Sequence, residues 1–207
     1  MTYTTSYVLA IDVETSGCHF KDNALLSIGC SLQNTDTNKE ISNLFVALKV
    51  PINKHFSEDS KGFWIQNSDI KHLIEKQAID PKYAMIKFVE YIKDIDNNYL
   101  NLTIISDNPS FDIAWIDLYL CQYTERKPLR YSSANNEYRM IWDSSSIQKI
   151  WLCIKEKHLN LYKPPRNHLT KLGLETTHTH HPLNDAKIMA NRYIETIKQI
   201  QNHLQNS

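Results

Sequence analysis

The chain has 207 residues, of which 42% are hydrophobic and 22% charged, and its formal net charge at pH 7 is zero. These totals are ordinary for a globular protein, and the length predicts a single domain over residues 1–207. No apolar stretch approaches membrane-spanning length, so an integral membrane protein is excluded and no membrane partner is expected. The balanced charge gives no support for a strongly basic nucleic-acid binder, although a local basic groove is compatible with it.

Four cysteines are scattered along the chain with no C-x-x-C pair: Cys18, Cys30, Cys121 and Cys153. This spacing favours a reduced, intracellular protein over a disulfide-bonded one. The first six residues are polar, so we expect no signal peptide. A cytoplasmic location is the expectation that follows.

The first quarter of the chain carries three strand patterns. An apolar run at 7–13 predicts a buried strand, and a period-two alternation at 24–33 predicts a second. A third alternation covers 40–48. The polar cluster at 34–38 is a turn signal, and so short a connection joins antiparallel strands. We therefore expect an antiparallel meander.

The rest of the chain alternates between helical and strand patterns, although residues 52–79 are hard to read beyond one short helix. Predicted helices cover about 69–76, 81–95, 110–122, 144–157, 167–172 and 182–204, and predicted strands cover 102–106 and 138–142. Together with the meander, this order predicts an α/β protein in three layers, with a mixed five-stranded central sheet flanked by helices.

Two carboxylates end the first predicted strand. Asp12 and Glu14 are two positions apart, so in a strand they project from the same face. Like charges held side by side repel, and a divalent cation bound by oxygen ligands is the usual compensation. Alone, such a pair is more often a solvated turn, so the interpretation depends on further acids elsewhere.

Two later acids each occupy the first turn of a predicted helix. Asp112 follows the predicted strand at 102–106, and Asp185 opens the last helix with His180 five positions before it. Either acid alone is explained by the helix dipole, which favours negative charge at this end. The joint pattern with Asp12 and Glu14 favours a shared metal site.

These motifs, in this order, resemble those of the DEDD-type 3′–5′ exonucleases of the ribonuclease-H-like fold, in the subclass whose fifth residue is histidine. The matching segments are Asp12-Val13-Glu14-Thr15, Asn108 to Asp112, and His180 to Asp185. The residues that flank these motifs are most similar to those of small bacterial, phage and viral exoribonucleases. Ribonuclease T and polymerase proofreading subunits belong to the same superfamily. The resemblance spans residues 7–195 and implies a ribonuclease-H-like fold.

The resemblance implies two Mg²⁺ or Mn²⁺ ions per active site. Asp12 would bridge both ions, Glu14 and Asp185 would hold the first, and Asp112 the second. Two such ions activate a water and stabilise the leaving oxygen in phosphodiester hydrolysis. His180 would act as general base, since histidine titrates near neutral pH.

Two alternatives involve the neighbouring histidines. His181 stands four positions before Asp185, which is the spacing of the tyrosine in a sister subclass, so it is the alternative general base. His178, His180 and His181 together could instead form a zinc site, although no cysteine stands at a convincing ligand spacing.

A 3′ exonuclease must hold the terminal nucleotide, and several residues near the motifs are candidates for that contact. The candidates are Val13, Thr15, Ser16, Leu26, Trp64 and, beside Asp112 in the predicted helix, Phe111. Trp64 and Phe111 are equally compatible with core positions. Candidate phosphate contacts, which are equally compatible with solvated surface, are Arg126, Lys127, Arg130, Lys163, Arg166 and Lys171.

The function that follows is metal-dependent 3′–5′ exonucleolysis that releases nucleoside 5′-monophosphates. The neutral charge favours RNA or short single strands over long duplexes. The alternatives are a DNA-preferring exonuclease, a non-catalytic nucleic-acid-binding module on the same fold, and an endonuclease or integrase. Relatives in the resembling family are often homodimers, so a homodimer is a further expectation.

Overall fold

The computed structural model describes residues 6–132, 134–157 and 167–206. Its strands are β1 (Tyr7–Thr15), β2 (Leu25–Asn34), β3 (Lys39–Ala47), β4 (Leu102–Ser106), β5 (Tyr131–Ser132), β6 (Glu137–Tyr138) and β7 (Ile141–Asp143). Its helices are α1 (Glu58–Gln66), α2 (Ser68–Gln77), α3 (Pro81–Asn98), α4 (Pro109–Tyr123), α5 (Ser144–Lys155), α6 (His168–Leu172) and α7 (Pro182–Gln205). None of the helices in these ranges combines the length and the apolar composition that crossing a membrane requires.

The central sheet has five strands in the order β3-β2-β1-β4-β7. β1, β2 and β3 form an antiparallel meander, whereas β4 runs parallel to β1 and β7 runs parallel to β4. The sheet is therefore mixed, as the sequence predicts. Because β1 and β4 are parallel neighbours, their carboxyl ends meet at one edge of the sheet, where open α/β sheets bind ligands.

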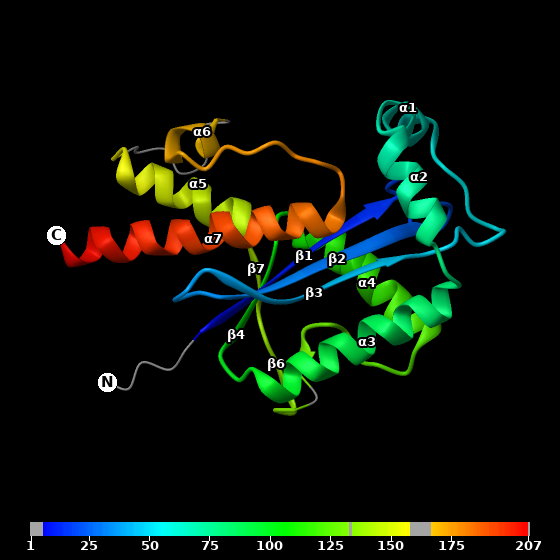
Figure 1. Cartoon of the computed structure of the whole chain (residues 1–207), viewed down its shortest axis with the longest axis horizontal. Helices are drawn as coiled ribbons and strands as arrows, with labels where there is room; N and C mark the ends of the chain where they lie inside the picture. The colour runs from blue at the N-terminus through cyan, green and yellow to red at the C-terminus, as the bar shows by residue number, and fades with distance from the viewer. Residues whose placement is uncertain (1–5, 133, 158–166, 207) are drawn as a thin grey trace.

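The two faces of β1 pack against different helices, which makes the three layers visible in Figure 1. Leu9, Ile11 and Val13 belong to the large core cluster that also contains the buried faces of α3 and α4. Val8 and Ala10 pack instead against α7. Period-two alternation therefore places the next even-numbered residues of β1 on the α7 side.

Helices α1 and α2 lie beyond the carboxyl end of β1 (Figure 1) and enclose a small core of their own, formed by Ala24, Leu26, Ala47, Trp64 and Ile74. The sequence did not predict α1, because Trp64 is its only buried residue and no apolar stripe marks it. The helix begins at Ser57, whose hydroxyl accepts from the backbone N–H of Ser60.

The fifth strand is shorter than predicted. The sequence predicts a strand at 138–142, whereas β7 covers Ile141–Asp143 and the preceding residues form the β5–β6 hairpin. The backbone explains the difference, since Tyr138 pairs with Tyr131 and the N–H of Arg139 donates to the carbonyl of Arg130 at 2.8 Å, within the hairpin. The side chain of Arg139 binds the buried carboxylate of Asp96 in α3 at 2.5 Å, and Arg126 binds the same carboxylate at 3.1 Å.

Gly29 allows the first turn of α7 to rest on the sheet. It lies directly opposite Asp12 in the β1–β2 pair. A Cβ atom at Gly29 would lie 2.1 Å from the backbone carbonyl carbon of Pro182, closer than such atoms can approach. Only glycine therefore permits this contact, and the contact brings the start of α7 over the end of β1.

Candidate active site

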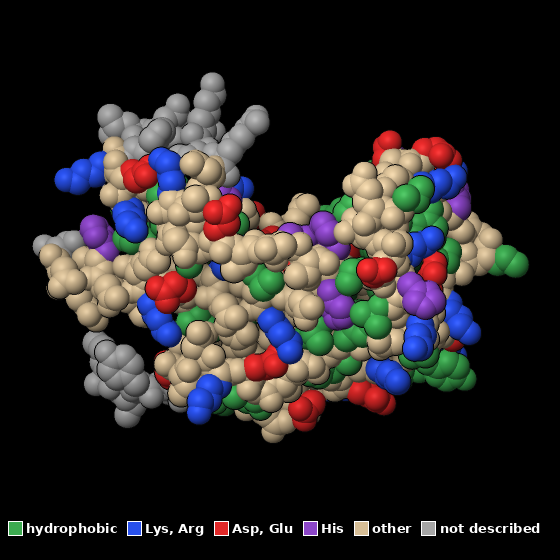
Figure 2. All heavy atoms as spheres, turned by 45° about the horizontal axis from the view of Figure 1, so that its top comes forward, with side chains coloured by type: hydrophobic (Ala, Val, Ile, Leu, Met, Phe, Trp, Pro, Cys, Tyr) green, Lys and Arg blue, Asp and Glu red, His purple; other side chains and the backbone are tan. Residues whose placement is uncertain are grey.

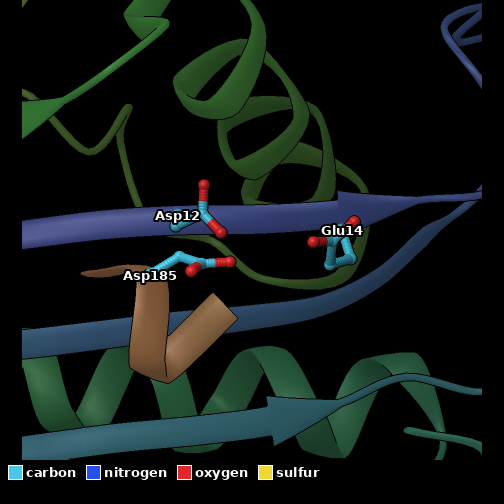
Figure 3. Close-up of side chains that lie close together, drawn as sticks. All are labelled: Asp12, Glu14 and Asp185. Atoms are coloured by element: carbon cyan, nitrogen blue, oxygen red, sulfur yellow. The ribbon is translucent and has the colours of Figure 1, made fainter. Parts of the chain in front are cut away.

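Three carboxylates converge where α7 meets the end of β1. Asp12 and Glu14 project from the α7-facing side of β1, and Asp185 comes from the first turn of α7. One oxygen of each lies within 4.8 Å of the other two. Figure 3 shows the three side chains pointing toward one another. Glu14 and Asp185 are buried and Asp12 is partly buried, so the mutual repulsion is poorly screened by water.

Asp112 reaches the same region from the first turn of α4. After burial, its charge is the strongest cause of the raised pKa of Asp12. Its carboxylate accepts a hydrogen bond from the hydroxyl of Ser106, the last residue of β4. The structure thus brings all four acids named by the sequence to the carboxyl ends of β1 and β4.

Burial and repulsion between carboxylates raise the pKa values of three of these acids, Asp12, Glu14 and Asp112. Burial is the largest cause for Asp12, whose pKa lies well above its ordinary value, with Asp112, Glu14 and Asp185 adding repulsion. Burial also raises the pKa of Glu14 from 4.5 to about 8, and that of Asp112 from 3.8 to about 7. Ionising the whole cluster near pH 7 is therefore unfavourable unless positive charge joins it.

We expect the metal-free protein to lose stability as the pH rises through about 7 and 8. The folded state holds protons on Glu14 and Asp112 more tightly than the unfolded state, so their contribution to stability is complete below the unfolded pKa values and disappears above the folded ones. Thermal unfolding in a chelator at about pH 6 and about pH 8.5 measures this slope.

Glu14→Gln is the informative variant for that experiment, because glutamine cannot titrate and should flatten the slope. Added Mg²⁺ should raise the unfolding midpoint more at the higher pH, where the carboxylates are free to bind it. Greater stability of the chelated wild type at about pH 8.5 than at about pH 6 would contradict the assigned electrostatics.

The donor set fits a hard divalent cation. All members are carboxylates, which are the ligands that Mg²⁺ and Mn²⁺ prefer. Oδ2 of Asp185 is buried and has no hydrogen-bond partner among the described residues, although Nε2 of His178 lies 3.6 Å away, so this oxygen is available to an ion. The zinc alternative is not supported, because the group of described residues whose ligand atoms lie close enough to hold a metal is Asp12, Glu14 and Asp185, without a histidine.

The histidines before α7 lie in different surroundings. His180 adopts a left-handed backbone conformation with φ 56°, and its ring contacts Phe63 of α1 edge-on, with ring centroids 4.7 Å apart. His181 precedes α7 and packs its ring on Phe45 of β3, with centroids 4.8 Å apart. Burial lowers the pKa of both rings. Figure 2 shows a hollow beside α1 and α2 with histidine side chains on its floor.

His178 is the histidine ring that approaches Asp185, with Nε2 3.6 Å from Oδ2. Its Nδ1 lies 2.9 Å from Nδ1 of His180. The sequence interpretation considered His178 only as a zinc ligand, since its spacing to Asp185 matches no motif. The structure places it between the acid and His180.

The turn after Glu14 is held by its own hydrogen bonds. The hydroxyl of Thr15 donates to the carbonyl of Gly17 at 2.9 Å, and the hydroxyl of Ser16 donates to the carbonyl of His55 at 2.8 Å. Trp64 anchors α1 to this turn, because its Nε1 donates to the carbonyl oxygen of Thr15 at 3.1 Å. The backbone here is rigidly placed beside the acids.

The candidate nucleotide contacts do not form a single group. Leu26 and Trp64 are both buried and line a mostly apolar cavity of about 170 Å³ between the β2–β3 strands and α1–α2. Val13 points its side chain into the core under α3 and α4. Phe111 is half-buried and lies near Trp115, with ring centroids 6.3 Å apart.

The basic residues mostly have local partners. Arg126 is committed to the buried Asp96, and Lys171 pairs with Glu156 at 2.9 Å. Lys127 and Arg130 lie over the rings of Tyr131 and Tyr138, at 3.8 and 5.1 Å from the centroids. The other two candidate phosphate contacts, Lys163 and Arg166, lie outside the described residues.

Two residues at the site escaped the sequence analysis. The hydroxyl of Ser106 donates a hydrogen bond to the carboxylate of Asp112, and the hydroxyl of Thr179 donates one to the carboxylate of Asp185. The only signal in the sequence was a hydroxyl residue six positions before Asp112 and another six positions before Asp185. That spacing matches no helix or strand period, so the sequence alone does not relate these hydroxyls to the acids.

Comparison with known proteins shows similarity at the level of structure. No protein-family model matches the sequence, and no curated protein sequence matches it. The nuclease domain of 3′hExo, a DEDDh family member bound to rAMP, superposes with a TM-score of 0.64 at 16% identity, covering 94% of this chain and 93% of that one. S. pombe Pop2p in its Mg²⁺- and Mn²⁺-bound form gives 0.62 at 12% identity, covering 93% and 82%.

E. coli exonuclease I in complex with a dT13 oligonucleotide is also similar, with a TM-score of 0.65 at 14% identity. The match covers 97% of this chain and 43% of that one, so this chain spans less than half of exonuclease I. The chain thus has the ribonuclease-H-like fold of the DEDDh 3′-exonucleases. The resemblance that the sequence motifs indicated is confirmed at the level of the fold.

Proposed function

We propose that the chain is a single-domain, metal-dependent 3′–5′ exonuclease. The observation that carries the proposal is the convergence of Asp12, Glu14, Asp112 and Asp185 at one edge of a ribonuclease-H-like sheet. Three of these carboxylates, Asp12, Glu14 and Asp112, have raised pKa values, and strongly perturbed carboxylates in one cluster are typical of functional sites. The similarity of the fold to several 3′-exonucleases supports the same conclusion.

Each acid has a proposed role in holding two ions. The charges of the other three acids all act on Asp12, which would bridge both ions. Glu14 and Asp185 would hold the first ion, and Asp112 would hold the second. Bound there, Mg²⁺ or Mn²⁺ would supply an activated water and would neutralise the charge of the departing oxygen. The chain's own contribution is to fix the carboxylates in one geometry on rigid elements.

His180 is the proposed general base. Burial and the neighbouring His178 lower its pKa, so the imidazole is neutral near pH 7 and can accept a proton. The contact between the two Nδ1 atoms occupies that nitrogen of His180 and leaves Nε2 for the water. His181, the alternative, has its ring packed on Phe45, two strands away from Asp12.

We expect His180→Ala to lower kcat by on the order of 10²–10⁴, the usual contribution of a positioned base. His181→Ala should act mainly on stability, because it removes a ring packed on β3. His178→Ala should give an intermediate loss of kcat, since it removes the partner that orients His180. Single-turnover hydrolysis of a labelled oligonucleotide measures all three, and a larger loss for His181→Ala than for His180→Ala would reverse the assignment.

The turn after Glu14 and the cavity lined by Leu26 and Trp64 form the proposed site for the 3′-terminal nucleotide. Thr15 and Ser16 would contact the 3′ end through their backbone, because their hydroxyls are engaged within the protein. Leu26 and Trp64 would support the sugar or base from the cavity that they line. Phe111 and the backbone of Val13 complete the proposed contacts.

RNA or a short single strand is the proposed substrate class. The zero net charge argues against tracking along long duplexes, where neutralisation of phosphates supplies the affinity. The four cysteines are all free, which supports an intracellular location. A homodimer is part of the proposal, on the resemblance alone.

The test is digestion of 5′-labelled RNA and DNA oligomers of matched sequence, with Mg²⁺, with Mn²⁺ and with a chelator. We expect stepwise shortening from the 3′ end that needs the metal, is blocked by a 3′-phosphate and is faster on RNA. Faster cleavage of DNA would favour the exodeoxyribonuclease alternative. Internal cleavage of the blocked oligomer would indicate an endonuclease, and tight binding without cleavage would indicate a non-catalytic module.

A further inference from the structure

We propose that Thr179 and Ser106 are positioning residues, which hold the carboxylates of Asp185 and Asp112 so that one oxygen of each is presented to a bound cation. This inference rests on the proposed function, since it concerns the same cluster. Asp185 and Asp112 belong to α7 and α4, two helices on opposite faces of the sheet. Their side chains therefore need separate constraints to meet Asp12 in one geometry.

Thr179 binds one carboxylate oxygen of Asp185 with two donors. Its backbone N–H donates to Oδ1 at 2.9 Å, and its hydroxyl donates to the same oxygen at 3.0 Å. The hydroxyl also accepts from the backbone N–H of His181 at 3.3 Å, which directs its own hydrogen toward Asp185. The other oxygen, Oδ2, is buried and has no hydrogen-bond partner among the described residues, and Nε2 of His178 lies 3.6 Å from it.

Ser106 constrains Asp112 with a single donor. It is fully buried at the carboxyl end of β4, and its hydroxyl donates to Oδ2 of Asp112. The same hydroxyl accepts from the backbone N–H of Asn108 at 3.0 Å, which helps to orient its hydrogen toward the acid. Both helix-borne carboxylates thus have one oxygen bound to a hydroxyl whose own orientation is constrained by a backbone N–H.

The physical consequence is a preorganised pair of ligands. Four neighbouring carboxylates repel, and a free side chain would rotate away from Asp12 to relieve that repulsion. A hydrogen bond to one carboxylate oxygen opposes the rotation and satisfies that oxygen, so the second oxygen can bind the cation. Residues that orient metal ligands in this way typically change metal affinity by about 10- to 100-fold when they are lost.

The experiment is titration of the chelator-treated full chain with Mn²⁺ by calorimetry, which reports binding without any requirement for activity. We expect Ser106→Ala to weaken Mn²⁺ binding by about 10-fold or more. Thr179→Val keeps the backbone donor and should weaken binding by about 10-fold, whereas Thr179→Ser keeps a hydroxyl and should restore most of the affinity.

Matched controls separate positioning from folding. Thr196 is fully buried in α7, and its hydroxyl donates a hydrogen bond to the carbonyl of Arg192. Ser132 is buried in β5. Thr196→Val and Ser132→Ala should leave Mn²⁺ binding unchanged, even where they lower the unfolding midpoint. Wild-type affinity in both Ser106→Ala and Thr179→Val would overturn the inference, whether or not the wild type digests RNA.

The two proposals fail in different ways. A wild type that binds Mn²⁺ but digests no oligomer overturns the proposed function, while the titrations of the variants still decide the roles of Thr179 and Ser106. A wild type that binds no Mn²⁺ overturns both. Loss of affinity in Thr179→Val that Thr179→Ser fails to restore also overturns the positioning role, because the hydroxyl would then be irrelevant.

Discussion

Asp12→Asn is expected to abolish exonuclease activity and, in the absence of metal, to stabilise the fold. Asp12 is the residue on which the charges of Asp112, Glu14 and Asp185 all act. Asparagine has nearly the same shape but no charge, so it removes the ligand proposed to bridge both ions. A loss of several kcal/mol of transition-state stabilisation corresponds to a fall in rate on the order of 10³ or more.

The stability change has the opposite sign because burial of crowded carboxylates is unfavourable. In a chelator at about pH 8.5, we expect Asp12→Asn to raise the free energy of unfolding by about 1–2 kcal/mol, as replacing buried charge by neutral groups often does. With Mg²⁺ present, the wild type should regain the advantage, since only it binds the ion fully. Loss of function with a gain of stability is typical of a functional residue.

Asp36→Asn is the control for this variant. Asp36 is exposed in the turn between β2 and β3, so its neutralisation should change neither activity nor unfolding. Oligonucleotide digestion and chemical denaturation measure the two effects independently. Retention of full activity by Asp12→Asn would remove the basis of the metal-dependent mechanism.

Gly29→Ala is expected to lower activity by about 100-fold or more, although Gly29 carries no reactive group. The added Cβ would lie 2.1 Å from a backbone atom of Pro182, and backbone cannot move aside as a flexible side chain can. The start of α7 must therefore shift away from the sheet and take Asp185 with it. A displacement of about 1 Å at a catalytic site can cost about 10²-fold in rate.

Gly62→Ala is the matched control, because a Cβ at Gly62 in α1 would meet nothing within 4 Å. Alanine in a helix interior should be neutral or stabilise the protein by about 0.5–1 kcal/mol. Gly29→Ala should instead destabilise it by about 1–3 kcal/mol through overpacking. Weaker Mn²⁺ binding should accompany the loss of activity, and unchanged kcat with unchanged Mn²⁺ affinity would contradict this packing of α7.

The elements that the sequence predicted well share a regular burial pattern. The meander at β1–β3 and the helices α3, α4 and α7 have apolar residues at strand or helix spacing, and the structure has them within a few residues of the predicted bounds. Helix α1 lacks such a pattern, since its single buried residue, Trp64, is held by a contact with Thr15. A helix that is held by one contact with a distant residue has no periodic pattern of apolar residues, so the sequence does not predict it.

The sequence identified the residue types of the candidate site, but it did not show how those residues are arranged in space. The alternation that buries Val8 and Ala10 under α7 also places Asp12 and Glu14 on that face, so the sequence alone determined that these two acids project together. The motifs named Asp112 and Asp185 as their companions. Chemistry that resides in residue type and spacing within one element is visible in the sequence.

Only the tertiary structure decided how the separate segments meet at the site. It showed that His178 contacts His180 and that His181 packs on β3. It also showed that Gly29 admits the start of α7, and that Ser106 and Thr179 hold the two helix-borne acids. These contacts join segments that are unrelated in spacing, so they depend on how the layers pack, which no periodicity within one segment records.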